Sequence, residues 1–290
     1  MTASTLQRIQ REISRFEVTG IVPFTQSICG MTGEVKTAQV GQGDDFHAFD
    51  RYRVGDDIRM VDWSVYARTK RLWTKRFSQA RTKQLILALD GSGSMRAGTE
   101  EKWTTTIECA LILQGLCVRN GFDASILVFG PKGIEWAPSV MDGSSIKRCL
   151  DWLVHYRCEG TEHIDSLKYI GPGTAGELCV LSDFMWKDVL RDLDSIEVQT
   201  QLALTCIRVS SIVDTQVPDG GYFDPETHAV SSVDEGSLLQ YRLDQFRNEI
   251  RETCRRKGKL FIDWSADDHT GSLKEWMMLR EAARPSRVPG

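Results

Sequence analysis

The sequence predicts an α/β protein in which helices cover both faces of a mostly parallel central sheet. Two apolar runs of strand length, Leu85 to Leu89 and Glu177 to Leu181, lack the polar alternation of half-exposed strands. Such runs are typical of central parallel strands that are buried on both faces. Each run leads into a carboxylate, Asp90 or Asp183. Helical patterns separate the strands along the chain, and this alternation favours parallel strands joined by right-handed crossovers.

The remaining elements follow from hydrophobic periodicity. Residues 2–17 carry apolar residues at spacings of three and four, which predicts an amphipathic helix. Its apolar stripe either packs on the body of the protein or docks on a partner, and the sequence leaves both alternatives open. Further helices are predicted over residues 100–120, 144–155, 236–257 and 273–282, and further strands over 72–77, 124–129, 134–137, 201–209 and 260–264.

Two hairpins are predicted from turn signals. The short connection Gly130-Pro131-Lys132-Gly133 makes the strands on either side of it an antiparallel pair. A second, exposed hairpin insertion is expected between residues 221 and 233, where Asp224-Pro225 marks the turn.

Three regions are expected along the chain. Residues 1–80 form an N-terminal helix and a charged strand and loop extension packed on the core, residues 81–284 form the α/β domain, and residues 285–290 form a flexible tail. The passage from Asp50 to Arg68 alternates charges of both signs with apolar residues. We interpret it as a set of Arg–carboxylate pairs with Trp63 in a core, or alternatively as a docking surface for a partner.

The composition excludes several classes of protein. The net charge of −4 gives no indication of a nucleic-acid partner. No apolar run approaches the roughly 20 residues of a membrane span, and the N-terminus lacks a signal-peptide pattern. The eight cysteines are scattered and form no CxxC pair, which suits reduced buried thiols better than disulfides or a zinc site. We therefore expect a cytoplasmic protein without a membrane span.

The segment Asp90-Gly91-Ser92-Gly93-Ser94 is the strongest candidate for a functional site. It places oxygen ligands at alternate positions directly after a buried strand, at the sheet edge where open α/β sheets bind ligands. Thr161 and Asp183 lie in loops expected at the same edge. Because Mg²⁺ prefers near-octahedral oxygen coordination, we predict a site for Mg²⁺ (or Mn²⁺ or Ca²⁺) formed by Asp90, Ser92, Ser94, Thr161 and Asp183.

The other motifs that this segment could represent are excluded because the sequence lacks residues that they require. A dinucleotide fingerprint GxGxxG would need glycine where Arg96 stands, and no GxxxxGK[ST] motif for phosphate binding occurs. A nucleophile elbow GxSxG would need glycine in place of Asp90, and a paired-aspartate phosphatase would need a carboxylate in place of Ser92. His155 and His163 lie near the Thr161 loop, but neither forms an evident catalytic dyad. We assign no catalytic residue.

These residues resemble a von Willebrand factor A-like domain with a metal-ion-dependent adhesion site. Asp90, Ser92 and Ser94 match the DxSxS motif of that site, Thr161 matches its threonine and Asp183 its second aspartate. More specifically, the chain resembles the bacterial family known as domain of unknown function 58. The passage from Tyr52 to Trp63, continued by Ala67-Arg68, carries that resemblance, which extends over about residues 40–282.

The chain departs from the family in two respects. Glu162 stands where many members have an aspartate after the motif threonine, and the N-terminal membrane helices of many members are not found here.

The resemblance implies a protein-binding module without enzymatic activity. Genes of the family typically neighbour MoxR-type AAA+ ATPases, which are thought to act as metal-insertion or assembly chaperones. The implied partner is such an ATPase or its client, with an Asp or Glu of the partner completing the Mg²⁺ coordination. Two alternatives stay open: a metal-dependent hydrolase that uses the same acidic cluster, or a scaffold in which the metal is only structural.

Overall fold

The computed structural model describes residues 2–18, 40–53, 58–78, 84–96, 101–119, 123–140, 143–161, 163–170, 176–186, 188–210, 220–223, 230–233 and 236–282. The chain divides into two compact units. The first combines Met1–Thr32 with Lys83–Gly290, and the second comprises Gly33–Thr82. Each unit is described by itself. The predicted packing of residues 1–80 as a whole on the core stays a prediction.

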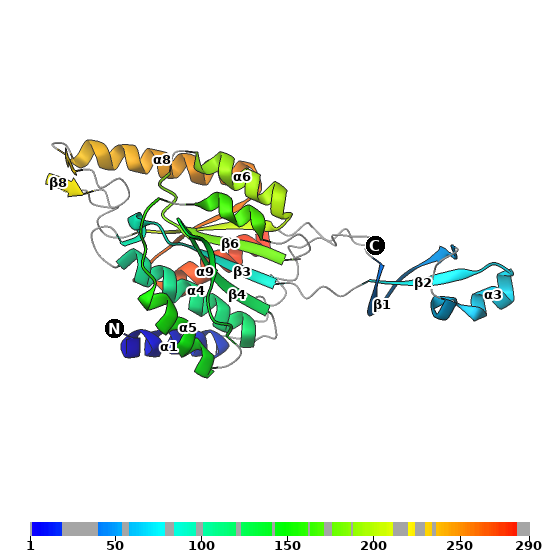
Figure 1. The fold of residues 1–290 in the computed structure, drawn as a ribbon. Helices are drawn as coiled ribbons and strands as arrows, with labels where there is room; N and C mark the ends of the chain where they lie inside the picture. Colours follow the sequence, from blue (N-terminus) through cyan, green and yellow to red (C-terminus); the bar gives the residue numbers. More distant parts are fainter. Residues whose placement is uncertain are drawn as a thin grey trace. The chain divides into compact units, whose positions relative to one another are not determined.

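A six-stranded sheet forms the centre of the first unit (Figure 1). Its order is β10-β7-β6-β3-β4-β5, and every neighbouring pair is parallel except β4 with β5. The strands are β3 (Gln84–Asp90), β4 (Asp123–Gly130), β5 (Gly133–Trp136), β6 (Gly176–Ser182), β7 (Ala203–Val209) and β10 (Leu260–Trp264). This confirms the predicted α/β fold class, and the hairpin predicted at Gly130–Gly133 is present.

The strand order places β3 beside β6 at the point where the order reverses. Counted along the chain, the six strands have the doubly wound order 3-2-1-4-5-6, with the third strand antiparallel at one edge. This is the von Willebrand factor A-like, Rossmann-like architecture that the sequence predicts. In such sheets ligands bind outside the carboxyl ends of the strands at the reversal point. Asp90 and Ser182 are the last residues of the two strands that meet there.

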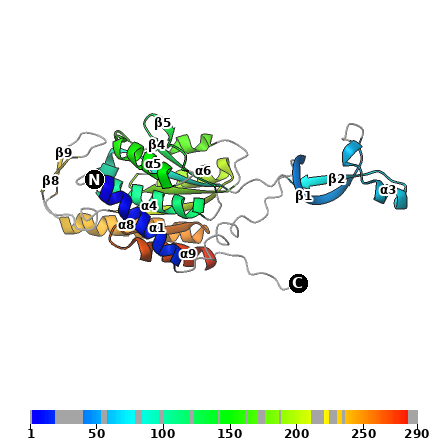
Figure 2. The same cartoon turned by 90° about the horizontal axis from the view of Figure 1, so that it is seen from below.

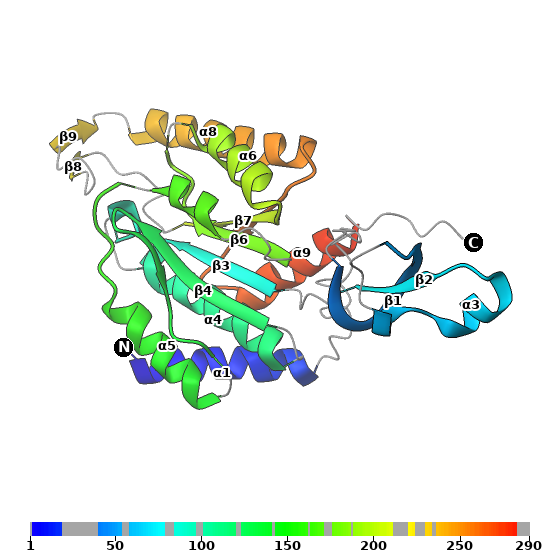
Figure 3. The same cartoon turned by 45° about the vertical axis from the view of Figure 1, so that its right-hand side comes forward.

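Two hydrophobic cores lie on opposite faces of the sheet. Leu85, Leu87 and Leu89 of β3 belong to one core, whereas Ile86 and Ala88 belong to the other, as expected for side chains that alternate along a strand. The first core is covered by α1 (Thr2–Val18), α4 (Glu101–Arg119), α5 (Gly143–His155) and α9 (His269–Ala282), and the second by η3 (Ile164–Tyr169), α6 (Val189–Thr200) and α8 (Gly236–Arg256) (Figures 1 and 3).

The N-terminal helix α1 packs on the body of its own unit (Figure 2). Ile9 and Ile13 are buried against α4 and α5. Ile13 lies so close to α4 that a Cβ added at Gly115 would be 2.5 Å from its Cδ1. Of the two alternatives left open for residues 2–17, intramolecular packing is therefore the one observed.

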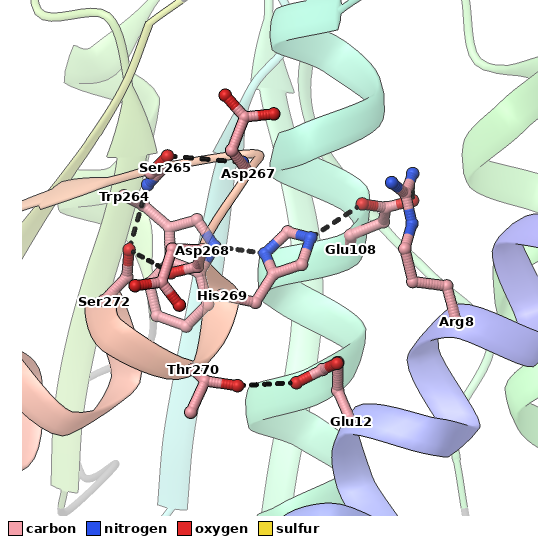
Figure 4. Close-up of polar contacts among 10 residues, drawn as sticks. All are labelled: Arg8, Glu12, Glu108, Trp264, Ser265, Asp267, Asp268, His269, Thr270 and Ser272. Atoms are coloured by element: carbon pink, nitrogen blue, oxygen red, sulfur yellow. Dashed lines mark hydrogen bonds and ion pairs between the residues drawn. The ribbon is translucent and has the colours of Figure 1, made fainter.

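A buried polar cluster adds to this contact (Figure 4). Glu108 of α4 pairs with Arg8 of α1, and its other oxygen lies 2.9 Å from Nε2 of His269 in α9. Trp264 donates from Nε1 to Nδ1 of the same histidine at 2.8 Å. Because Nδ1 accepts, the proton of the neutral ring sits on Nε2 and is donated to Glu108. Glu108, a carboxylate in a nearly wholly buried helix, is thus satisfied from two sides.

The second unit contains a β-ribbon and a short helix. Strands β1 (Val40–Arg51) and β2 (Trp73–Ser78) pair antiparallel, and η1 (Ile58–Met60) and α3 (Trp63–Thr69) lie between them in sequence. Asp62 caps α3, because its Oδ1 accepts from the backbone N–H of Ser64 at 2.9 Å. Trp63 is 58% exposed, so the interpretation that places it in a core is wrong as far as this unit is concerned.

Strands β8 (Gly220–Phe223) and β9 (Val230–Val233) pair antiparallel. That they form an exposed insertion stays a prediction, and the Asp224-Pro225 turn lies outside the described residues. Within the described part of the chain, none of the helices combines the length and the apolar character that crossing a membrane requires.

Candidate functional site

The turn after β3 is built around close backbone contact at Gly91. Its N–H donates to the carbonyl of Phe129 in β4 at 2.8 Å. A Cβ at this position would lie 2.7 Å from Cγ1 of Val128 and 2.9 Å from Cε1 of Tyr156, closer than real side chains approach. Glycine is therefore required here by lack of space, and it allows the chain to turn immediately after Asp90.

The two serines of the motif lie side by side in this turn. The backbone N–H of Ser92 donates to Oδ1 of Asp90 at 2.9 Å, which folds the turn back over the strand end. The hydroxyl oxygens of Ser92 and Ser94 are 3.0 Å apart. Ser92 is buried and Ser94 is partly exposed. Two hydroxyl groups and one carboxylate of the predicted set are thus brought together at the end of β3.

Ser182, which the sequence analysis missed, holds the second oxygen of Asp90. Its hydroxyl donates to Oδ2 of Asp90 at 2.6 Å and accepts from the backbone N–H of Phe184 at 3.0 Å. Both oxygens of Asp90 therefore already accept a hydrogen bond, so this carboxylate is suited to orienting other ligands as well as to binding a cation. The sequence does contain an indication that Ser182 belongs to the site, because it stands directly before Asp183 at the end of the strand that pairs with β3.

Asp183 lies close to Asp90 but has a different partner. The ammonium group of Lys102, the second residue of α4, lies 2.9 Å from Oδ2 of Asp183, and the two side chains are only 4% and 6% exposed. Oδ1 of Asp183 accepts from the backbone N–H of Met185 at 3.2 Å. Lys102 was not among the predicted site residues either, although it stands at the start of a predicted helix whose residues 107–118 are mostly apolar.

The electrostatics of the site disfavour two free negative charges. Burial raises the pKa of Asp90, the nearby carboxylate of Asp183 raises it further, and hydrogen bonds from Ser182 and Ser92 oppose the rise, with a result of about 7. A cation placed beside Asp90 and Asp183 would relieve this repulsion.

Thr161 belongs to a loop that forms backbone hydrogen bonds with the same turn. The N–H of Gly93 donates to the carbonyl of Gly160 at 2.9 Å, and the N–H of Glu159 donates to the carbonyl of Gly91 at 3.1 Å. Thr161 follows directly and is exposed. Glu162, which stands in place of the family's aspartate, lies outside the described residues. The structure therefore brings this loop to the serines, as the sequence analysis expects.

An open cleft of about 460 Å³ adjoins the turn through Tyr156. Lys132, His155 and Arg157 contribute to its lining. His155 is bonded to its own helix, since its Nδ1 lies 2.6 Å from the carbonyl oxygen of Asp151.

The donor set fits a hard cation such as Mg²⁺. Carboxylate and hydroxyl oxygens are the ligands that Mg²⁺ and Ca²⁺ prefer, whereas zinc sites favour sulfur and nitrogen. Within the described ranges, no group of three or more His, Cys, Asp or Glu side chains is placed to hold a metal. A cation at this edge therefore depends on the hydroxyls of Ser92, Ser94 and Thr161 as much as on the two aspartates. That these residues bind one stays a prediction.

Comparison with protein families gives one match. The family described as "Protein of unknown function DUF58" matches residues 49–259, more than half of the chain and including the site residues. The chain belongs to the DUF58 family. The matched part of this DUF58 protein contains the passage from Tyr52 to Trp63 that carries the resemblance noted above, whereas α1 lies before the matched residues. No curated protein matches the chain.

Three solved structures are similar to parts of this DUF58 protein. Proximal thread matrix protein 1 of the mussel byssus is 13% identical, with a TM-score of 0.34 over 44% of this chain and 38% of that one. The manganese-loaded TRAP protein of Plasmodium vivax is 16% identical, with a TM-score of 0.32 over 45% of this chain and 58% of that one. The pilus adhesin SpaC of Lactobacillus rhamnosus GG is 13% identical, with a TM-score of 0.26 over 72% of this chain and 28% of that one. The chain spans less than two thirds of each, and similarity at this level does not transfer a function.

Proposed function

We propose that this DUF58 protein is a non-enzymatic module that binds a divalent cation and uses it to capture an acidic side chain of a protein partner. Ser92, Ser94 and Thr161 supply hydroxyl ligands, and Asp90 and Asp183 supply negative charge and orient the hydroxyls. Mg²⁺ is the first candidate because all the ligands are oxygen, with Mn²⁺ and Ca²⁺ as alternatives.

One observation carries this proposal. Asp90, Ser92, Ser94 and Asp183 lie at or directly after the ends of two neighbouring strands and meet at the carboxyl edge of the sheet, at the reversal point of the strand order. Two buried carboxylates with like charge at that edge favour binding of a cation. A cation that keeps exchangeable water positions can then accept a carboxylate from another protein, and this contact depends on the metal.

The partner that the family resemblance implies is a MoxR-type AAA+ ATPase or a client of such an ATPase. Within this proposal the DUF58 protein contributes to assembly or activation of the client, and the metal contact makes the interaction reversible. The cleft that adjoins the turn through Tyr156 gives room for residues flanking the partner's acidic side chain.

The two alternatives lack a comparable observation. A hydrolase needs a general base beside the metal, yet no third His, Cys, Asp or Glu joins Asp90 and Asp183 in the part of the chain that the structure covers. A purely structural metal predicts that its removal lowers stability and leaves binding by the folded protein unchanged.

A two-step experiment tests the proposal. In the first step, titration calorimetry with Mg²⁺ and Mn²⁺ compares the unchanged protein with Asp90→Ala and Ser92→Ala, and with Ser195→Ala as a control on α6. Both site variants are expected to lose affinity at least about tenfold, and the control is expected to match the unchanged protein.

In the second step, the MoxR-type ATPase of the same genome is pulled down with and without EDTA. Retention that depends on the metal and is lost in Asp90→Ala supports the proposed function. Equal retention in EDTA and in Asp90→Ala would show that the metal site does not bind the partner.

A further inference from the structure

Lys102 places a positive charge inside the candidate metal site. Its ammonium group is 2.9 Å from Oδ2 of Asp183, and both groups are shielded from water. Of the buried charged side chains in the described chain, three meet at this edge of the sheet: Asp90, Lys102 and Asp183. The remaining ones lie elsewhere, for example Glu108 against α1 and α9, and Glu177 at the opposite end of β6.

The charges of these three groups do not balance. When both aspartates are ionised, they and the lysine together carry a single negative charge. A divalent cation changes that balance to a single positive charge. Without Lys102, the same cation and the same two aspartates would already be neutral, and an incoming carboxylate would then add an uncompensated negative charge in a poorly hydrated place.

We propose that Lys102 is the residue that makes the cation-loaded site select a carboxylate ligand. With the cation bound, one carboxylate brings the buried charge to zero, so the site favours an acidic ligand over a neutral amide of the same shape. This inference rests on the proposed function. Within it, Lys102 favours binding of the carboxylate ligand and does not itself bind the metal.

A second buried lysine, Lys259, forms an ion pair that has a purely structural role in the same fold. Lys259 is as shielded as Lys102, but it pairs with Glu197 and also lies 3.4 Å from Oδ1 of Asp194. Both carboxylates are on α6, away from the motif turn, and no serine hydroxyl of the motif is involved. Lys259 therefore provides a matched control for the loss of one buried positive charge.

The test uses the full chain, Mn²⁺ as the metal and acetate as the carboxylate probe, with acetamide as its neutral analogue. Lys102→Gln removes the charge and keeps an N–H donor for Asp183, Lys102→Arg keeps the charge, and Lys259→Gln is the control. Mn²⁺ affinity is measured first by calorimetry. Acetate affinity is then measured at saturating Mn²⁺ from the change in the electron paramagnetic resonance signal of the bound ion.

In Lys102→Gln we expect Mn²⁺ affinity to be equal or higher and acetate affinity to fall about tenfold or more. Lys102→Arg and Lys259→Gln should bind acetate within about threefold of the unchanged protein, and acetamide should bind weakly to every variant. Undiminished acetate binding in Lys102→Gln overturns the inference, as does a loss of Mn²⁺ affinity confined to that variant. Absence of Mn²⁺ binding by the unchanged protein would instead overturn the proposed function.

If Lys102→Gln does not fold, the double variant Lys102→Gln/Asp183→Asn takes its place, because it leaves no unpaired buried charge at that position. One aspartate and one divalent cation again leave a single positive charge. The double variant is therefore expected to bind acetate about as well as the unchanged protein at saturating Mn²⁺. Asp183→Asn also removes a group assigned to the metal site, so a weaker Mn²⁺ affinity is expected, and acetate is measured at Mn²⁺ concentrations that saturate the double variant. Failure of the saturated double variant to bind acetate would overturn the charge balance on which the inference depends.

Discussion

The hydroxyl of Ser182 donates a hydrogen bond of 2.6 Å to Oδ2 of Asp90 and so links the ends of the two strands that meet at the reversal point of the sheet. The hydroxyl oxygen of Ser182 also accepts the N–H of Phe184, a residue that adopts a left-handed backbone conformation with φ of 56°. One side chain therefore fixes both the carboxylate and the turn that carries Asp183.

Replacing Ser182 with alanine is expected to weaken both folding and metal binding. The substitution leaves the buried Oδ2 of Asp90 and the N–H of Phe184 without their partner, which lowers the free energy of unfolding by about 1–3 kcal/mol. Loss of the group that orients Asp90 should lower Mn²⁺ affinity about tenfold or more. Urea denaturation and calorimetry measure the two effects.

Ser125→Ala is the control for Ser182→Ala. Ser125 accepts a hydrogen bond of 2.7 Å from Gln84 at the opposite end of the sheet. The Ser125→Ala variant should lose a similar hydrogen bond and keep full Mn²⁺ affinity. Equal loss of affinity in both variants would argue that general destabilisation, and not the orientation of Asp90, lowers metal binding.

The raised pKa of Asp90 predicts how stability depends on pH in the absence of metal. The carboxyl titrates at about 7 in the folded protein against an ordinary value of 3.8, so the unfolded state releases its proton first. The contribution of Asp90 to stability is therefore fully present below about pH 4 and is lost as pH rises through 7, on the order of 4 kcal/mol in all. Asp90→Asn should remove this slope, and the exposed Asp123→Asn should keep it. Denaturation in EDTA at several pH values measures the slope, and a slope that persists in Asp90→Asn contradicts the assignment.

Gly91→Ala is expected to destabilise the protein and to displace the motif turn. The added methyl group would lie 2.7 Å from Val128 and 2.9 Å from Tyr156, and overpacking of this kind costs about 1–3 kcal/mol. Gly130→Ala is the matched control at the same edge, because its closest new contact is 3.4 Å. Thermal denaturation compares the two, and equal melting temperatures would mean that the turn adjusts without strain.

His269→Ala is expected to lower the free energy of unfolding by about 2–5 kcal/mol, because Glu108 and the indole N–H of Trp264 both lose a buried partner. Thr270→Ala removes only the partly exposed hydrogen bond to Glu12 and should cost less than about 1 kcal/mol. Chemical denaturation of both variants checks the difference. A cost for His269→Ala no larger than that for Thr270→Ala would show that the buried cluster adds little.

The main sheet and most helices could be predicted because their signals are local. Continuous apolar runs gave β3 and β6, and amphipathic spacing gave α1, α5 and α8. Helix α6 was missed although Val189, Leu193, Ile196 and Thr200 are its buried positions, at helical spacings. Charged residues between these buried positions obscure the helical spacing in the sequence.

The site could be predicted only in part, since sequence pattern identifies ligands more readily than their supports. Asp90, Ser92 and Ser94 share one short motif, whereas Ser182 and Lys102 reach the site from other elements. Trp63 was misplaced because an aromatic residue among charges suggests a core, while in the structure it contacts Tyr66 edge to face on an exposed helix.

The placement of α1 sets the order in which the protein can complete its fold during synthesis. The helix is synthesised before the elements on which it packs, because Arg8 pairs with a residue 100 positions later and Glu12 bonds one 258 positions later. At roughly 5–20 residues per second, the apolar stripe of α1 waits many seconds for its last partners. Ile9 and Ile13 can pack as soon as α4 and α5 have formed, whereas the hydrogen bond from Thr270 to Glu12 must wait for α9, so the contacts of α1 are completed in stages that end with α9.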